Sequence, residues 1–76
     1  MSHFTMKNLK TVLYNLSIVG EYPQEIKTTA LNRAIAKATG SIHPQVIDAF
    51  IKGMEEIGIL AYSKETSILL RGADDL

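Results

Sequence analysis

Two adjacent carboxylates and two histidines are the side chains whose chemistry would suit catalysis or metal binding. Glu55 and Glu56 are neighbours in the sequence. On a helix they would point about 100° apart, so they do not form an acid–base pair. The only histidines, His3 and His43, are too far apart in the sequence to suggest a metal site. The chain also has no Ser-His-Asp order with supporting glycines and no phosphate-binding loop. We therefore expect no enzyme, no catalytic residues, no cofactor and no metal.

The charged side chains are balanced in number but unevenly distributed. Eight Lys and Arg oppose eight Asp and Glu, and a net charge of zero argues against a strongly basic nucleic-acid-binding protein. Up to Gly40, five bases against two acids give +3, and from Ser41 onward three bases against six acids give −3. An anionic partner should therefore prefer the surface of the first half. The bases of that half are Lys7, Lys10, Lys27, Arg33 and Lys37.

The length and composition of the chain fit one small globular domain over residues 1–76. The 76 residues are 46% hydrophobic and 21% charged, and the lack of cysteine excludes disulfides and thiolate zinc sites. A domain of this size buries only roughly 60% of its unfolded surface, so a dimer interface would be a common way to add stability. No apolar run reaches the ~18 residues that span a bilayer, and the N-terminus lacks the apolar core of a signal peptide. We expect a soluble, cytoplasmic protein with no membrane partner.

Residues 5–18 predict the first helix. Thr5 can serve as its N-cap, and Gly20 supplies the stop. Residues 21–24 then predict a turn, because Pro23 cannot continue a helix. The apolar stripe of the helix comprises Leu9, Val12, Leu13 and Leu16.

Residues 30–39 predict the second helix, which Thr28 or Thr29 can cap. The preceding segment, residues 25–28, is ambiguous, since it could form a short strand that pairs with a C-terminal hairpin. The inward positions of the helix are Leu31, Ala34, Ile35 and Ala38, and the outward positions are Asn32, Arg33 and Lys37.

A tight turn separates this helix from a third one. Gly40 stands where left-handed backbone geometry is usual after a helix, and Pro44 suits the first position of the next helix. Ser41 and Ile42 make the turn, with Ile42 expected to fill the space between the two helices. The third helix ends at Gly58. Its core-facing stripe is predicted as Val46, Ala49, Phe50, Gly53, Met54 and Ile57.

Ile47 and Ile51 lie on the flank of the third helix, between this stripe and the solvent face. They could widen the core, or they could form an exposed patch for a protein partner or a second copy of the chain. Gly53, in the middle of the helix, costs roughly 1 kcal/mol relative to Ala. It would let the first helix or the sheet approach closely.

Two short apolar segments, residues 59–62 and 67–70, predict a β-hairpin with its turn at residues 63–66. The acidic C-terminal residues 72–76 are expected to form a frayed tail. The sequence thus predicts an α+β fold with three helices followed by a C-terminal hairpin.

With the elements in this order, residues 31–71 resemble the winged helix-turn-helix superfamily, most closely small transcription regulators of the multiple-antibiotic-resistance-regulator type (MarR- and PadR-like). In those proteins a Leu-Ala-x-x-Leu-Gly-like helix precedes the turn, and the recognition helix ends in Leu-Glu-x-x-Gly-Leu before the wing. The corresponding segments here are Ile35-Ala36-x-x-Thr39-Gly40 and Met54-Glu55-Glu56-Ile57-Gly58-Ile59. The resemblance implies that the C-terminal hairpin is the wing.

The resemblance also implies a DNA-binding surface. Its base-reading positions fall on Ser41, His43, Gln45, Asp48 and Lys52, with Lys64 at the tip of the wing and Arg33 and Lys37 near phosphates. Gln45 could make a bidentate contact to adenine. The function implied is a dimeric transcriptional regulator that binds double-stranded DNA.

The exposed face of the third helix departs from this pattern, because its charges sum to −2 where the family usually places bases. That sign is unfavourable against duplex DNA. The alternative function is a winged-helix module for protein–protein interaction in a replication, transcription or segregation assembly. The face consists of Gln45, Asp48, Lys52, Glu55 and Glu56.

Overall fold

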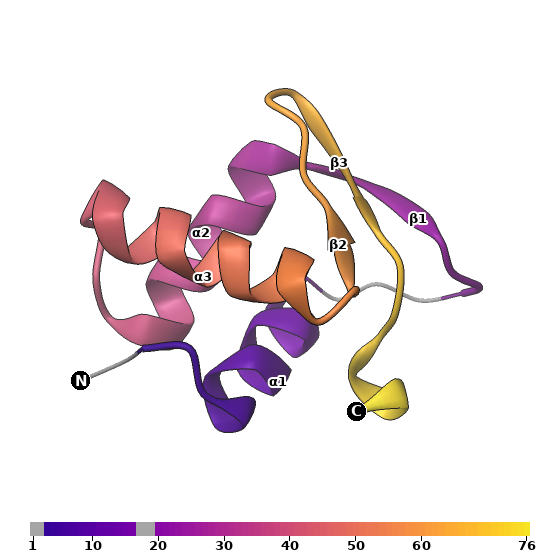
Figure 1. Ribbon diagram of the computed structural model, residues 1–76, viewed down its shortest axis with the longest axis horizontal. Coiled ribbons are helices and arrows are strands. Elements are labelled where there is room, and N and C mark those ends of the chain that lie inside the picture. Colours follow the sequence, from indigo (N-terminus) through magenta and orange to yellow (C-terminus); the bar gives the residue numbers. More distant parts are fainter. Residues whose placement is uncertain (1–2, 17–19) are drawn as a thin grey trace.

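The computed structural model describes residues 3–16 and 20–76. Within them the chain forms three α-helices, a three-stranded antiparallel sheet and a short 3-10 helix, which confirms the α+β class. Figure 1 shows the α-helices gathered on one side of the molecule and the sheet on the other. The elements follow in the order α1 (Met6–Asn15), β1 (Gln24–Lys27), α2 (Thr28–Thr39), α3 (Pro44–Glu56), β2 (Leu60–Ala61), β3 (Thr66–Leu69) and η1 (Ala73–Asp75).

Helix α1 begins as the sequence predicts and ends earlier. The Thr5 hydroxyl accepts a hydrogen bond from the backbone N–H of Asn8 at 3.1 Å, which confirms Thr5 as the N-cap. The helix ends at Asn15, and Leu16 is its C-cap. The prediction that Gly20 stops the helix is therefore wrong, and the predicted last positions, 17 and 18, lie outside the described residues.

The ambiguous segment at residues 25–28 is resolved as strand β1, which pairs with β3. Strand β3 lies between β1 and β2, and both of its neighbours are antiparallel to it. The predicted hairpin is confirmed, although β2 is only two residues long. Along the strands, side chains alternate between the core and the solvent. The buried ones are Ile26, Leu60, Ser67 and Leu69.

Thr28 ties the start of α2 to the hairpin instead of capping the helix. Helix α2 begins at Thr28 itself, so the predictions of Thr28 or Thr29 as its cap and of residue 30 as its start are wrong. The buried Thr28 hydroxyl donates to the carbonyl oxygen of Ser63 and lies 2.7 Å from the Ser67 hydroxyl. Buried hydroxyls need such partners, because leaving one unpaired costs about 1–3 kcal/mol.

The outward positions of α2 are only partly as predicted. Arg33 and Lys37 are exposed, whereas Asn32 is half-buried. The side-chain oxygen of Asn32 is buried and has no hydrogen-bond partner among the described residues. The inward positions are confirmed, since Leu31, Ala34 and Ile35 are buried and Ala38 packs against the core.

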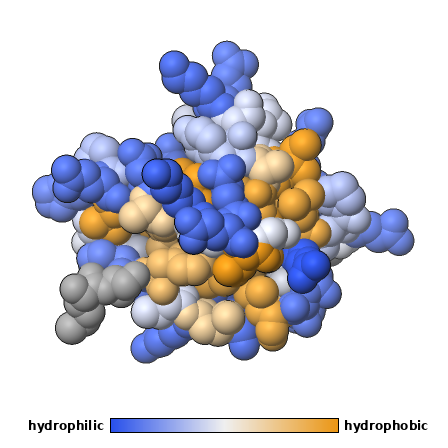
Figure 2. Space-filling view, viewed as in Figure 1, coloured by the Kyte–Doolittle hydropathy of each residue, from blue (hydrophilic) through white to orange (hydrophobic). Residues whose placement is uncertain are grey.

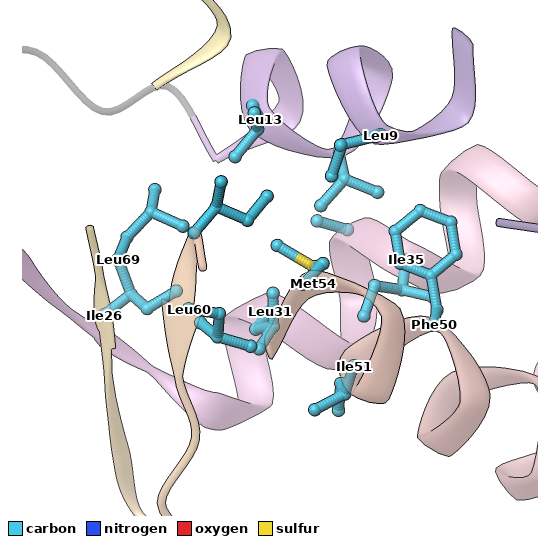
Figure 3. Close-up of a cluster of buried hydrophobic side chains, with 13 residues drawn as sticks. Leu9, Leu13, Ile26, Leu31, Ile35, Phe50, Ile51, Met54, Leu60 and Leu69 are labelled. Carbon is cyan, nitrogen blue, oxygen red and sulfur yellow. The ribbon is translucent and has the colours of Figure 1, made fainter. Parts of the chain in front are cut away.

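Every α-helix and every strand of the described chain contributes to one hydrophobic core (Figure 3). Helix α1 contributes from above in that view, the sheet closes one side, and α2 and α3 close the other. The side chains labelled in the figure are Leu9, Leu13, Ile26, Leu31, Ile35, Phe50, Ile51, Met54, Leu60 and Leu69.

Helix α3 is rotated about its axis relative to the predicted stripe. Phe50 and Met54 are fully buried as predicted, but Ala49 is exposed and Ile57 is 45% exposed. The Ile51 side chain, in contrast, is only 5% exposed, and Ile47 packs against the core. The core-widening alternative for Ile47 and Ile51 is therefore confirmed. Because Ile51 is buried and Ile47 is half-buried, the two residues do not form the exposed patch of the other interpretation.

The ring of Phe4 covers the Gly53 side of α3. A Cβ atom built on Gly53 would lie 2.8 Å from that ring, so the close approach expected at Gly53 is made by Phe4, two residues before α1, and not by the first helix or the sheet. The same ring meets Phe50 edge-on, with 5.0 Å between the ring centroids and 80° between the planes.

The α2–α3 turn has the predicted backbone but presents one side chain differently. Gly40 adopts the left-handed region (φ 72°, ψ 16°), and Pro44 starts α3. The Ile42 side chain is 83% exposed, so the prediction that it fills the space between the helices is wrong. Ile35 and Phe50, fully buried on α2 and α3, occupy the region between these helices instead (Figure 3).

The C-terminal residues are ordered against the body of the protein, so the prediction of a frayed tail is wrong. Gly72 is buried, and its backbone N–H donates to a carboxylate oxygen of Asp75 at 3.3 Å. Ala73 packs against the core. The ring of Tyr22 lies so close to Gly72 that an added Cβ would be 2.7 Å from Cζ.

Candidate functional site

The first turn of α3 and the turn before it present a small polar surface. The side chains of His43 and Gln45 are exposed there, together with Ile42. The Ser41 hydroxyl, half-buried, accepts a hydrogen bond from the backbone N–H of His43 at 3.3 Å, and the Ser41 N–H lies 3.3 Å from the Thr39 hydroxyl oxygen. Ser41 therefore holds the turn in place, and His43 and Gln45 are the polar side chains presented to solvent.

The start of α3 is electrostatically suited to an anion. A helix N-terminus carries roughly half a positive charge from its aligned peptide dipoles. The first turn of α3, from Pro44 to Ile47, contains no acidic residue that would neutralise it. The first acid on the helix is Asp48, in the second turn.

Further along α3, the polar side chains face the hairpin. Asp48, Lys52 and Glu55 line a shallow groove of about 310 Å³ whose other walls are Ile51 and Tyr62. Figure 2 shows a band of hydrophilic side chains across the middle of the face on which α3 lies, with hydrophobic surface on both sides of it. Asp48 and Lys52 thus belong to a mixed-charge groove, and Tyr62 is a member that sequence reasoning missed.

Arg33 and Lys37 lie together in a different groove. They are exposed on α2 and line a hollow of about 230 Å³ whose remaining walls come from α1 and from small residues of α2. This hollow shares no lining residue with the groove beside Tyr62. The bases that the sequence assigned to phosphate contacts are therefore one group, separate from the acids of α3.

Two lysines lie near the turn between β2 and β3. Lys64 is in that turn and is exposed, as expected. Lys27 is exposed at the end of β1, where it pairs with Thr66, the first residue of β3. Sequence reasoning counted Lys27 only in the total charge. Assigning residues 25–28 to a strand would have placed it beside the turn.

Comparisons of this chain with protein-family models, curated proteins and solved structures found no match. In the described part of the chain, no group of three or more His, Asp and Glu is placed to hold a metal ion. None of the helices there is long and apolar enough to cross a membrane.

The structure therefore divides the predicted site residues into four groups. His43 and Gln45 form an exposed N-terminal end of α3 that Ser41 supports. Asp48 and Lys52 lie on the side of α3 that faces the hairpin. Two basic groups lie off α3: one is Arg33 with Lys37 on α2, and the other is Lys64 with Lys27 by the hairpin turn.

Proposed function

We propose that this protein is a small winged helix-turn-helix protein that binds double-stranded DNA, as a dimeric transcriptional regulator does. The element order supports the proposal, because α2, a tight turn and α3 are followed directly by the β2–β3 hairpin. Figure 1 shows α3 crossing the front of the molecule with the hairpin turn projecting beyond it, an arrangement that is compatible with a wing. Helix α3 is then the recognition helix.

The observation that carries the proposal is the N-terminal end of α3. It offers Gln45 and His43 to solvent beside a helix N-terminus that no acid of the first turn neutralises. A glutamine amide can bond both the N6 and N7 positions of adenine in the major groove. Lys27 and Lys64 on the hairpin side would bind phosphates elsewhere on the same duplex.

The acids of α3 do not prevent this mode of binding if the helix enters the groove by its N-terminal end. Glu55 and Glu56 are ten and eleven residues beyond Gln45, or about 15–17 Å along the helix. Exposed charges more than about 10 Å apart are largely screened at 0.1 M salt. Asp48 is closer, and Lys52, one turn further on, offsets its charge.

A single copy has few bases with which to bind phosphates, so the proposal includes a dimer. Dimeric helix-turn-helix proteins place their recognition helices about 34 Å apart, one turn of DNA. The molecule measures 32 × 25 × 21 Å. Two copies side by side can therefore reach successive major grooves.

Fluorescence anisotropy with a labelled random-sequence duplex at low salt tests the proposal. We expect binding at micromolar protein that weakens steeply with added salt. Lys64→Ala should reduce the slope of log affinity against log salt by about 1, because one phosphate contact is lost. Lys7→Ala removes the same charge from an exposed position on α1 and serves as the control, with an unchanged slope. No binding at micromolar protein and low salt would refute the proposal.

Two further variants distinguish phosphate contacts, which position the protein on DNA, from base contacts, which read its sequence. Arg33→Ala combined with Lys37→Ala should weaken binding to all duplexes by a similar factor, because phosphate contacts carry no sequence information. Gln45→Ala should instead bind its preferred sequence less tightly and other sequences equally well. A uniform loss for Gln45→Ala would show that its side chain does not read a base.

A second candidate function rests on the groove beside Tyr62. Asp48 and Glu55 are two helical turns apart on the same side of α3 and share this groove with the Tyr62 ring. Carboxylates beside an aromatic ring suit a basic segment of a protein partner. A pull-down from nuclease-treated lysate tests it, with Asp48→Asn combined with Glu55→Gln as the control bait. A partner retained equally by both baits would show that the acids do not recruit it.

A further inference from the structure

Ile42 has the most exposed side chain among the large hydrophobic residues that the structure describes. The Ile42 side chain is 83% exposed, compared with 45% for Ile57, the C-cap of α3. Single exposed apolar residues are common and need no explanation by themselves. Ile42 differs because it lies in the α2–α3 turn, at the end of α3 that presents Gln45 and His43.

The turn that carries Ile42 is held by hydrogen bonds on both sides. The Gly40 N–H donates to the Ala36 carbonyl oxygen at 2.9 Å, and the His43 N–H donates to the Ser41 hydroxyl at 3.3 Å. After the turn, the N–H groups of Val46 and Ile47 both donate to the His43 carbonyl oxygen, at 3.0 and 3.2 Å. The backbone on either side of Ile42 is therefore fixed, and its side chain is presented outward from a defined position.

The side chain itself is suited to a rigid apolar contact. A β-branched residue has few χ1 rotamers, so little conformational freedom is lost when a partner covers it. Around it, the exposed side chains His43 and Gln45 can form hydrogen bonds. Within four residues, this surface therefore offers one apolar side chain, Ile42, and two polar ones, His43 and Gln45.

We propose that Ile42 determines sequence specificity by contacting the 5-methyl group of thymine in the major groove. This inference rests on the proposed DNA-binding function and deepens it. The thymine methyl is the apolar group among the base edges that the major groove displays, and apolar side chains recognise it. Gln45, three residues further along the chain, reads an adjacent adenine. The preferred half-site therefore contains both an adenine and a thymine next to the α3 N-terminus.

The test uses a duplex selected by the wild-type protein from a random pool, with each thymine replaced in turn by uracil. Uracil keeps the hydrogen-bonding groups and lacks only the methyl group. At one position per half-site, wild-type affinity should fall about three- to tenfold. Ile42→Ala should bind the unmodified duplex more weakly by a similar factor and should show no further loss with uracil.

Ile57→Ala is the matched control, because it removes the same side chain from an exposed position at the other end of α3. It should retain the full dependence on the thymine methyl. Circular dichroism melts should show all variants folded, since both side chains are exposed. The inference is overturned if wild type tolerates every uracil, or if Ile42→Ala keeps the same dependence on the methyl.

Two other results have distinct meanings. If no duplex is enriched from the pool and none binds at low salt, the proposed function itself fails and this inference falls with it. If Ile42→Ala instead changes the sedimentation of the free protein while its dependence on thymine methyl persists, Ile42 contacts a second copy of the chain, and the inference is again overturned.

Discussion

Replacing Gly53 with alanine should destabilise the protein, although the same change stabilises most helices. In the interior of a helix, Ala is favoured over Gly by about 1 kcal/mol. At Gly53, however, the new Cβ would lie 2.8–2.9 Å from three atoms of the Phe4 ring. Ordinary contact requires at least 3.4 Å. The ring must therefore leave the surface of α3.

The cost of moving the ring can be worked from what it contacts. Its edge-on contact with Phe50, at 5.0 Å, is worth about 0.5–1.5 kcal/mol. Phe4 is also partly buried against the core, and half of the roughly 1.5–3 kcal/mol for full burial would be lost with it. After subtracting the gain in helix propensity, we expect a net loss of about 1 kcal/mol, or a fall in Tm of about 4–8 °C.

Urea unfolding followed by circular dichroism, in the wild-type and Phe4→Ala backgrounds, provides the assay. In the wild type, Gly53→Ala should lower the free energy of unfolding. In Phe4→Ala, where no ring lies above the glycine, it should raise that free energy by up to about 1 kcal/mol. Gly58→Ala is the matched control. Nothing lies within 4 Å of its added Cβ, and its positive φ of 78° makes alanine unfavourable in both backgrounds. If Gly53→Ala stabilises both backgrounds equally, Phe4 does not pack on Gly53.

Three further substitutions test the packing that positions the candidate site. Thr28→Val keeps the side-chain shape but removes the hydroxyl that donates to the Ser63 carbonyl and meets the Ser67 hydroxyl, so unfolding free energy should fall by about 0.5–1.5 kcal/mol and amide exchange should accelerate in the hairpin. Gly72→Ala should cost about 1–3 kcal/mol and change the Tyr22 fluorescence, because the added Cβ meets that ring. Ile51→Ala should cost about 2–5 kcal/mol in a urea titration, whereas Ile42→Ala should change stability by less than about 0.5 kcal/mol; equal effects would contradict their different burial.

Short-range chemistry explains which parts of the fold could be predicted from the sequence. Thr5 caps α1 through a residue three positions away, and Gly40 and Pro44 fix the ends of α2 and α3 through their own backbone preferences. Each of these effects acts within one helical turn. The α+β class followed from the same local patterns, since the helical stripes and the short apolar strands are visible without knowledge of the packing.

Contacts between distant segments explain what could not be predicted. The hydroxyl of Thr28 looked like a helix cap, but its partners Ser63 and Ser67 are 35 and 39 residues away. The Gly53 side of α3 is covered by Phe4, 49 residues before Gly53. Neither contact leaves a pattern in the sequence around the residue that it affects.

The same limit applied to the candidate site. The sequence correctly grouped residues that are close along the chain, such as Ser41, His43 and Gln45. It missed Lys27, because that lysine reaches the hairpin turn only through the pairing of β1 with β3.

The rotation of α3 also determines which of its side chains a partner can meet. With Ile51 turned into the core, the exposed ridge of the helix runs through Gln45, Ala49, Lys52 and Glu56. One turn beyond Gln45, Ala49 offers no polar group, and two turns further Glu56 offers a charge that a duplex repels. If α3 reads bases as we propose, the reading would be confined to its N-terminal end and to the turn before it. An extended contact along the whole helix would suit a basic partner better than DNA. The part of α3 that binds therefore indicates the class of partner. Gln45→Ala and Ile42→Ala test for DNA at the N-terminal end. Asp48→Asn combined with Glu55→Gln tests for a basic partner along the flank.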